Sequence, residues 1–183
     1  KPNLQRSIRR LQRDVPYLGE RRRLYLQWGK ILLGTNLDNG LNEDPMYSNF
    51  SFDLSCLYET FLRFFDLCAI NHIKFSSVRA VGAENDYIAM TLSQILGVPL
   101  LSEQDQNRRA NFPTLNLCST WNEKYLQQNG VHFALIVSKK YLHNPNQLPD
   151  FIGVVTNEEQ SSEEVFDRTI PRCPERLFAL MSK

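Results

Sequence analysis

The chain has 183 residues, of which 42% are hydrophobic and 22% are charged, and its formal net charge is +1. This composition is that of a folded globular protein, and it excludes a disordered chain. The apolar runs are much shorter than the roughly 20 residues that a membrane-spanning helix needs. The chain begins at Lys1 instead of Met, so we expect an excised fragment of a longer protein, from which any targeting segment could have been removed.

The positive charge is concentrated near the amino terminus. Residues 1–30 hold nine Lys or Arg and two acidic residues, a net charge of +7, which leaves −6 for the rest of the chain. Such asymmetry indicates an acidic partner surface, which is nucleic acid, a membrane or the protein's own acidic body. The residues expected to contact nucleic acid are Arg9, Arg10, Arg13, Arg21, Arg22 and Arg23.

Two amphipathic helices are expected first. One covers residues 4–13 and ends before Pro16, because the residue preceding proline avoids helical geometry. The other covers residues 18–33. Its buried stripe consists of Leu24, Trp28, Ile31 and Leu32.

A connector rich in turn signals follows at residues 34–52. It predicts a boundary between a helical amino-terminal segment, residues 1–47, and an α/β domain, residues 48–183. Beyond it, Asp53 is placed to cap a strongly apolar helix. The apolar positions of this helix are Leu54, Leu57, Phe61, Leu62, Phe65 and Cys68.

Residues 75–101 are the stretch around which the chain is organised. Their pattern predicts a strand at 78–81, a helix with apolar residues at i, i+4, i+7 and i+8, and a second strand at 98–101. Gly97 suits the left-handed residue that ends such a helix, and Pro99 prevents the helix from continuing. This order predicts a right-handed βαβ unit with parallel strands.

The remaining residues alternate between strands and short helices. Strands are expected at 114–118, 131–137 and 151–156. Thr120 and Glu123 form a capping box that opens a short helix ending at Gly130, and Ser161 and Glu164 form a second box. Pro174 suits the first position of a last helix. The fold predicted is therefore α/β, a mostly parallel sheet with helices on its faces, Rossmann-like or phosphoribosyltransferase-like, and a helical amino-terminal segment.

The four cysteines have no spacing typical of a metal finger or a redox pair. They are Cys56, Cys68, Cys118 and Cys173. Cys56 and Cys68 are about 18 Å apart along one predicted helix, which is too far for a disulfide. We therefore expect free thiols, a cytoplasmic protein, no metal and no cofactor.

Residues 78–101, whose text includes AVGAENDYIAMTLSQILGVPLL, resemble the first phosphate-loop region of type I phosphoribosyltransferases. In that family a strand ends in a small-residue loop, and an alanine-rich helix leads to an LGVPL-type strand. The resemblance implies that the strand at 134–137 is followed by two acidic residues and a glycine–threonine loop that bind ribose phosphate. Here Ser138, Lys139 and Lys140 follow it instead, so the parts that hold ribose and phosphate are missing.

Three functions are consistent with these residues. The favoured one is a catalytically silent domain of phosphoribosyltransferase-like architecture that serves regulation, protein interaction or self-association. The second is an enzyme acting on a phosphorylated or nucleotide-like small molecule at the carboxyl ends of the strands. The third is a nucleic-acid-binding module that uses the amino-terminal arginines.

Candidate site residues follow from the second function. The candidate catalytic residues are Glu84, Asp86, Glu103 and His143, and the candidate ligand-binding residues are Asn85, Arg108, Arg109, Lys139 and Lys140. The carboxylates near 84–86 also fit a simpler role, because acidic residues stabilise the start of a helix. No Walker loop, GxSxG elbow or HExxH motif is present, and this excludes only the commonest enzyme classes.

Overall fold

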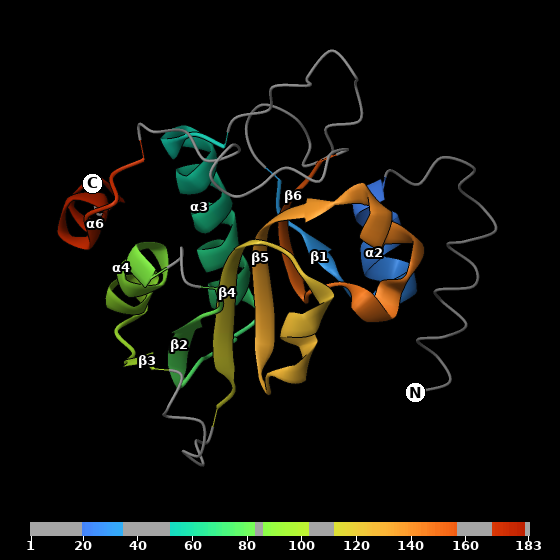
Figure 1. Ribbon diagram of the computed structural model, residues 1–183, viewed down its shortest axis with the longest axis horizontal. Coiled ribbons are helices and arrows are strands. Elements are labelled where there is room, and N and C mark those ends of the chain that lie inside the picture. Colours follow the sequence, from blue (N-terminus) through green and yellow to red (C-terminus); the bar gives the residue numbers. More distant parts are fainter. Residues whose placement is uncertain (1–19, 35–51, 83–85, 103–111, 157–169, 182–183) are drawn as a thin grey trace.

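A six-stranded, all-parallel sheet forms the centre of the molecule (Figure 1). The computed structural model describes residues 20–34, 52–82, 86–102, 112–156 and 170–181. The strands are β1 (Ile31–Leu32), β2 (Ser77–Ala80), β3 (Leu100–Leu101), β4 (Thr114–Thr120), β5 (Val131–Ser138) and β6 (Phe151–Thr156). The α-helices are α2 (Glu20–Trp28), α3 (Leu54–Ile70), α4 (Asp86–Leu96) and α6 (Pro174–Met181). The 3-10 helices are η2 (Glu123–Gln127), η3 (Lys139–His143) and η4 (Pro145–Gln147).

The strand order is β1-β6-β5-β4-β2-β3, and all five neighbouring pairs are parallel. The chain runs outward from β2 through α4 to β3, then returns across β2 to form β4, β5 and β6. The direction of winding therefore reverses between β2 and β4. The predicted α/β fold with a mostly parallel sheet is confirmed.

One face of the sheet, called here the α3 face, is covered by α3, α4 and α6 (Figure 1). Its core is aromatic: the ring of Phe64 lies 4.7 Å from that of Phe133 and 5.1 Å from that of Phe151. All three side chains are at most 4% exposed. Asp53 caps α3 by accepting from the Cys56 N–H at 2.7 Å, as its sequence position predicts.

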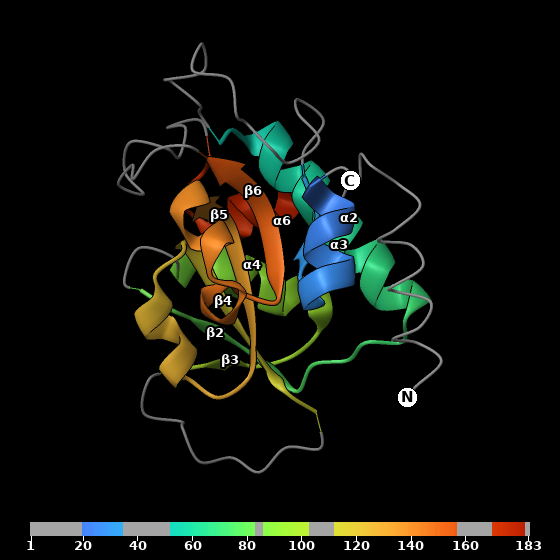
Figure 2. The ribbon, with the colours of Figure 1, turned by 90° about the vertical axis from the view of Figure 1, so that its right-hand side faces the viewer.

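The opposite face, called the α2 face, is covered by α2 and the three 3-10 helices. Its core consists of Leu24 of α2, the side chains of β5 and β6 that point to this side, and Trp121, Tyr141, Leu142 and Leu148. The 3-10 helices are short, because only ten residues, 121–130, connect β4 to β5 and only twelve, 139–150, connect β5 to β6. Figure 2 shows α2 at the β1 end of the sheet, next to α3.

The predicted helix over residues 18–33 is wrong in its second half. The helix α2 ends at Trp28, because Gly29 adopts a φ of 67°, which reverses the chain direction. Ile31 and Leu32 then pair with Phe151 and Ile152 of β6. The amino-terminal segment thus contributes a strand to the sheet, and the predicted boundary between residues 47 and 48 lies outside the described residues.

The capping box at Thr120 is also wrong, because Thr120 is the last residue of β4. Asn122 caps the following helix instead, since its side chain accepts from the Lys124 N–H at 3.1 Å. Two predicted helix boundaries are confirmed. The helix α4 ends just before Gly97, which has a φ of 66°, and α6 begins at Pro174. The second capping box, at Ser161 and Glu164, lies outside the described residues.

Candidate functional site: an arginine-rimmed pocket and a buried polar row

The candidate site residues chosen from the sequence do not form one cluster in the described part of the chain. Asp86 is exposed at the start of α4, on the α3 face. Lys139, Lys140 and His143 belong to η3, on the α2 face. The other candidates, Glu84, Asn85, Glu103, Arg108 and Arg109, lie outside the described residues, as do Arg9, Arg10 and Arg13.

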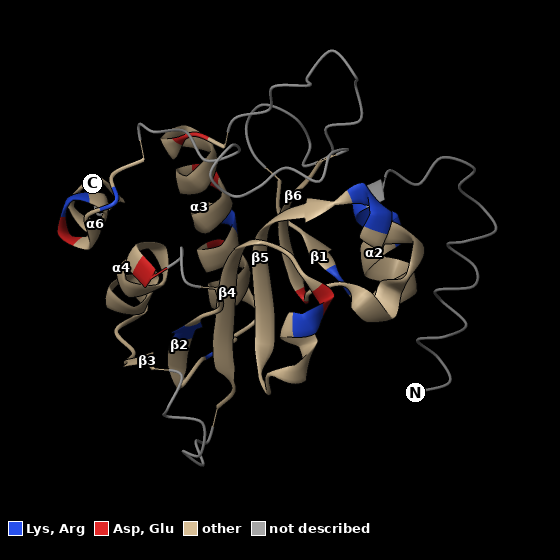
Figure 3. Ribbon diagram, in the orientation of Figure 1, with Lys and Arg blue, Asp and Glu red and all other residues tan. Residues whose placement is uncertain are grey.

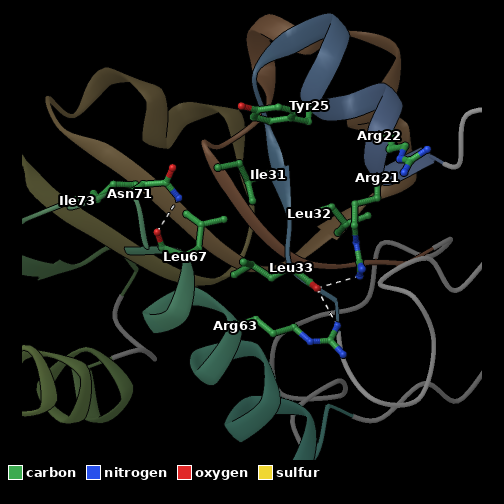
Figure 4. Close-up of a pocket in the computed structure, with 10 residues that line it drawn as sticks. All are labelled: Arg21, Arg22, Tyr25, Ile31, Leu32, Leu33, Arg63, Leu67, Asn71 and Ile73. Carbon is green, nitrogen blue, oxygen red and sulfur yellow. Dashed lines mark hydrogen bonds between the residues drawn. The ribbon is translucent and has the colours of Figure 1, made fainter. Parts of the chain in front are cut away.

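A pocket of about 520 Å³ lies instead at the β1 end of the sheet, where α2 and α3 meet (Figure 4). Its lining residues are Arg21, Arg22, Tyr25, Ile31, Leu32, Leu33, Arg63, Leu67, Asn71 and Ile73. They come from three stretches of the chain: α2, β1 with its next residue, and α3 with the turn that follows it. We call this cavity the edge pocket.

The floor of the edge pocket is apolar and its rim is basic. Ile31, Leu32, Leu33, Leu67 and Ile73 provide aliphatic surface, while Arg21, Arg22 and Arg63 provide the charge. None of the ten lining residues is acidic. Figure 3 shows the same concentration of basic residues on α2. The pocket therefore favours an occupant that is apolar at its centre and negatively charged at its ends.

Two of the arginines are held in place by one backbone carbonyl. The Nη2 of Arg21 and the Nη1 of Arg63 both donate to the Leu33 oxygen, each at 2.9 Å (Figure 4). Arg63 also lies 3.5 Å from Glu59 one helical turn earlier. A guanidinium has five N–H donors, so Arg63 retains donors beyond its bonds to Leu33 and Glu59.

No described strand pairs with the outer edge of β1, although Leu32 and Leu33 are buried. Ile31 and Leu33 donate their N–H groups toward the β6 side, to Asp150 and Ile152. In a parallel ladder the residue between two such donors points the opposite way. The N–H and C=O of Leu32 therefore face the pocket side, where an added extended segment would find hydrogen-bond partners.

A second feature, the polar row, crosses the α2 face of the sheet. Its members are Lys30, Asp150, His132, Asn116 and Arg79. Strand register puts them side by side: Arg79 is level with Asn116, and Asn116 with His132. The pairing of Phe133 and Ile31 with Phe151 places their preceding residues, His132 and Lys30, beside Asp150.

The Asp150 end of the polar row is well paired. Asp150 accepts from Lys30 Nζ at 3.1 Å and from the His132 backbone N–H at 2.9 Å. Burial works against ionisation of this carboxyl, but the bonds from His132 and the charge of Lys30 lower its pKa from 3.8 to about 2. The Nε2 of His132 donates to the Tyr125 carbonyl at 3.0 Å, and the Trp121 ring meets the imidazole edge-on.

An aspartate beside a histidine resembles part of a catalytic triad, but the nucleophile is absent. No Ser, Thr or Cys side chain of the described residues bonds to either imidazole nitrogen. The nearest thiol along the strands, Cys118, is buried, which raises its pKa and disfavours a thiolate. The pair therefore joins β5 and β6 to η2, and it supplies no nucleophilic chemistry.

The described residues include neither a metal-binding cluster nor a membrane-spanning helix. They contain no group of three or more His, Cys, Asp or Glu side chains that could hold a metal ion. Among them, no helix has the length and apolarity required to cross a bilayer. The four cysteines are free, and three of them, Cys56, Cys68 and Cys118, are buried.

The edge pocket and the polar row were not predicted from the sequence, because each is built from single polar residues in otherwise apolar elements. Arg63 stands in the middle of an apolar helix, and Arg79 and His132 are single polar residues in apolar strands. Each interruption was a usable signal. The residues that complete the pocket and the row are remote in sequence, however, and only the strand order brings them together.

Comparison with known proteins found no match, either to a family model, to a curated protein or to a solved structure. The class that the fold and the site define is therefore structural: an all-parallel α/β protein with an arginine-rimmed pocket at one edge of its sheet. The resemblance to phosphoribosyltransferases stays a prediction.

Proposed function

We propose that this chain is a catalytically silent α/β domain of phosphoribosyltransferase-like architecture, with a regulatory role that it performs by binding another protein. The observation that supports this proposal is the edge pocket, an apolar cavity with three arginines and no acidic residue among its described lining residues. The edge pocket lies at the β1 edge of the sheet and not at the switch between β2 and β4, where an enzyme of this fold class binds its substrate.

The partner is an extended segment that carries a large apolar side chain between acidic residues. An aliphatic or aromatic side chain fits the floor formed by Leu33, Leu67 and Ile73. Carboxylates on either side pair with Arg22 and with the remaining donors of Arg63. The backbone of the segment lies along β1, where Leu32 provides one N–H and one C=O.

Nucleic acid is a weaker candidate because two of the described arginines already serve the fold. Arg21 donates to the Leu33 carbonyl, and Arg23 lies over the Trp28 ring at 5.4 Å. The buried free thiols support a cytoplasmic location, because a reducing compartment keeps such thiols unpaired.

Peptide display tests the partner. A random peptide library is selected on the immobilised chain, and enriched peptides are measured by fluorescence anisotropy. We expect sequences with an apolar residue flanked by Asp or Glu, and an affinity that falls at least about tenfold in Arg22→Glu and Tyr25→Ala. Both side chains are exposed, Tyr25 by 60%, so both variants should fold normally.

The matched control is Arg176→Glu, a charge reversal at an exposed arginine of α6, on the opposite side of the molecule from α2 (Figure 1). It should leave peptide binding unchanged. If the selected peptides bind Arg22→Glu and Tyr25→Ala as well as the original chain, the edge pocket is not the docking site.

Calorimetry with phosphoribosyl pyrophosphate and magnesium tests the absence of catalysis. We expect no heat of binding that depends on Lys139, because Lys139 and Lys140 stand where the family has its acidic pair. Micromolar binding that Lys139→Ala abolishes would instead support the enzyme.

A further inference from the structure

Arg79 carries a charge into the interior of the sheet. It lies in β2, between Val78 and Ala80, and only 7% of it is exposed. Val78 packs into the core of the α3 face, so Arg79, the next residue along the strand, points to the α2 face. In Figure 3 the neighbouring strand β4 shows no charged residue, while β2 carries a basic one.

The guanidinium of Arg79 has no partner among the described residues. Its Nε is buried without a hydrogen bond, and no described acidic side chain forms an ion pair with it. The acid of the polar row, Asp150, is three strands away, about 14 Å at the usual strand spacing, and already binds Lys30 and His132.

A buried arginine in this state is energetically unfavourable. Its side chain stays protonated under all physiological conditions, so it cannot avoid the cost of burial by losing the charge. Buried charges in proteins are therefore paired with an opposite charge. The described residues supply no counter-charge to Arg79, and this points to an anion.

Two acceptors near Arg79 are also unsatisfied. Asn116, level with Arg79 on β4, is 1% exposed, and its Oδ1 is buried without a hydrogen bond. Its Nδ2 donates to the Asn129 carbonyl at 3.2 Å, which places the segment after η2 against it. Gln128, in that same segment, has a buried Oε1 without a partner.

We propose that the α2 face of the β2–β4 pair binds a small oxyanion that also carries a hydroxyl group, such as a phosphate or a hydroxy acid. Arg79 supplies charge-assisted N–H donors to the oxyanion, and Asn116 Oδ1 accepts from the hydroxyl. The strand β3 lies next to β2 at the edge of the sheet, and its Leu100 and Leu101 are both partly exposed. It is separate from the edge pocket, which lies at the opposite edge of the sheet.

Inorganic phosphate is the first probe, with sulfate at equal ionic strength as its comparison. At pH 7 phosphate has a P–OH group that Asn116 can accept from, and sulfate does not. We expect the Tm of the whole chain to rise with phosphate concentration, because a ligand that binds only the folded state stabilises it. At equal ionic strength, the increase in Tm with sulfate should be at most about half of the increase with phosphate. In Arg79→Met, whose side chain is similar in length and uncharged, the phosphate response should be lost.

The variant Arg79→Met also tests the proposal in buffer without phosphate, where its Tm should increase. In buffer without phosphate, Arg79→Met should raise Tm by at least about 2 °C, because it removes an uncompensated buried charge. Arg79→Lys, which keeps a charge but loses the planar fork of donors, should retain a weakened phosphate response. Arg176→Met, at an exposed arginine, should change neither quantity.

Two results would overturn the proposal. A phosphate response that persists in Arg79→Met places the anion elsewhere. A lower Tm for Arg79→Met in phosphate-free buffer, with no phosphate response in the original chain, means that a carboxylate of the chain itself pairs with Arg79, and Glu103→Gln or Glu84→Gln would then lower Tm to the same extent.

Discussion

The two faces of the sheet are built by different means. The α3 face is packed by α3 and α4, of 17 and 11 residues, by the shorter α6, and by a cluster of phenylalanine rings. In that cluster Phe64 contacts Phe75, Phe133 and Phe151. The α2 face is covered by one nine-residue helix and three 3-10 helices, and it carries the polar row beneath them. The contrast indicates that the α3 face supplies most of the stability. The α2 face holds the buried polar atoms of Arg79 and Asn116 that have no hydrogen-bond partner.

The largest effect that this comparison predicts is at the centre of the α3 face. Phe64→Ala should lower the free energy of unfolding by about 3–5 kcal/mol, because it removes a fully buried ring and leaves a cavity. Urea denaturation followed by circular dichroism measures the change. Leu62→Ala, on the same helix but 39% exposed, is the control and should cost less than about 1 kcal/mol.

A smaller loss is expected on the α2 face. Trp121→Phe removes the indole N–H that donates to the Gln147 carbonyl at 2.6 Å, so the carbonyl loses its partner. The expected cost is about 1–2 kcal/mol, measured in the same urea experiment. Leu126→Ala, at a 37% exposed position of η2, should be nearly neutral. A loss of unfolding free energy as large as that of Phe64→Ala would contradict the inference that the α3 face supplies most of the stability.

The paired end of the polar row predicts a dependence on pH. The pKa of Asp150 is lowered from 3.8 to about 2, so its contribution is fully present above the unfolded pKa and is lost as the pH falls from about 4 to 2. Because the side chain is 43% exposed, solvent screening reduces this contribution to about 1 kcal/mol.

Asp150→Asn should therefore be less stable than the original chain at pH 7 and equally stable near pH 2. Urea midpoints at pH 7, 4, 3 and 2 measure the difference. A difference that stays constant down to pH 2 would show that the variant acts through packing and not through the charge.

The smallest effect concerns local opening and leaves stability unchanged. Burial raises the pKa of Cys118, on the α2 face, and Cys56 on the α3 face is 0% exposed, so a thiol reagent reaches either only when its face opens. Short covering helices open more readily than long packed ones. Mass spectrometry should find exposed Cys173 labelled at once, then Cys118, and Cys56 last. Equal rates for Cys118 and Cys56 would mean that the two faces open together.

Much of the fold could be predicted from the sequence because its elements are long and periodic. The apolar spacing of α3 and α4, the glycine at position 97 and the apolar runs of β5 and β6 each specify their element locally. The strand β1 could not be predicted in this way. Ile31 and Leu32 continue the helical spacing of Leu24 and Trp28, and only the edge of β6 makes them a strand.

The edge pocket and the polar row depend on tertiary structure to a greater degree. Arg21 and Arg63 share one carbonyl although 42 positions separate them in the sequence, and Asn116 lies beside Arg79 only through the parallel register of β2 and β4. The candidates taken from the sequence were chosen near helix starts and strand ends. The unpaired charge of Arg79 lies inside a strand, where a polar residue becomes informative only once its surroundings are known.

The pairing of β1 with β6 has a consequence for synthesis of the chain. Ile31 leaves the ribosome about 120 residues before its partner Phe151, roughly 6–24 s earlier at about 5–20 residues per second. During that interval the apolar side of α2 lacks the surface that covers it in the finished fold. The sheet then closes through a contact of very high sequence separation, which is the slowest kind to form. A nascent chain of this protein should therefore be a chaperone client until β6 emerges and docks.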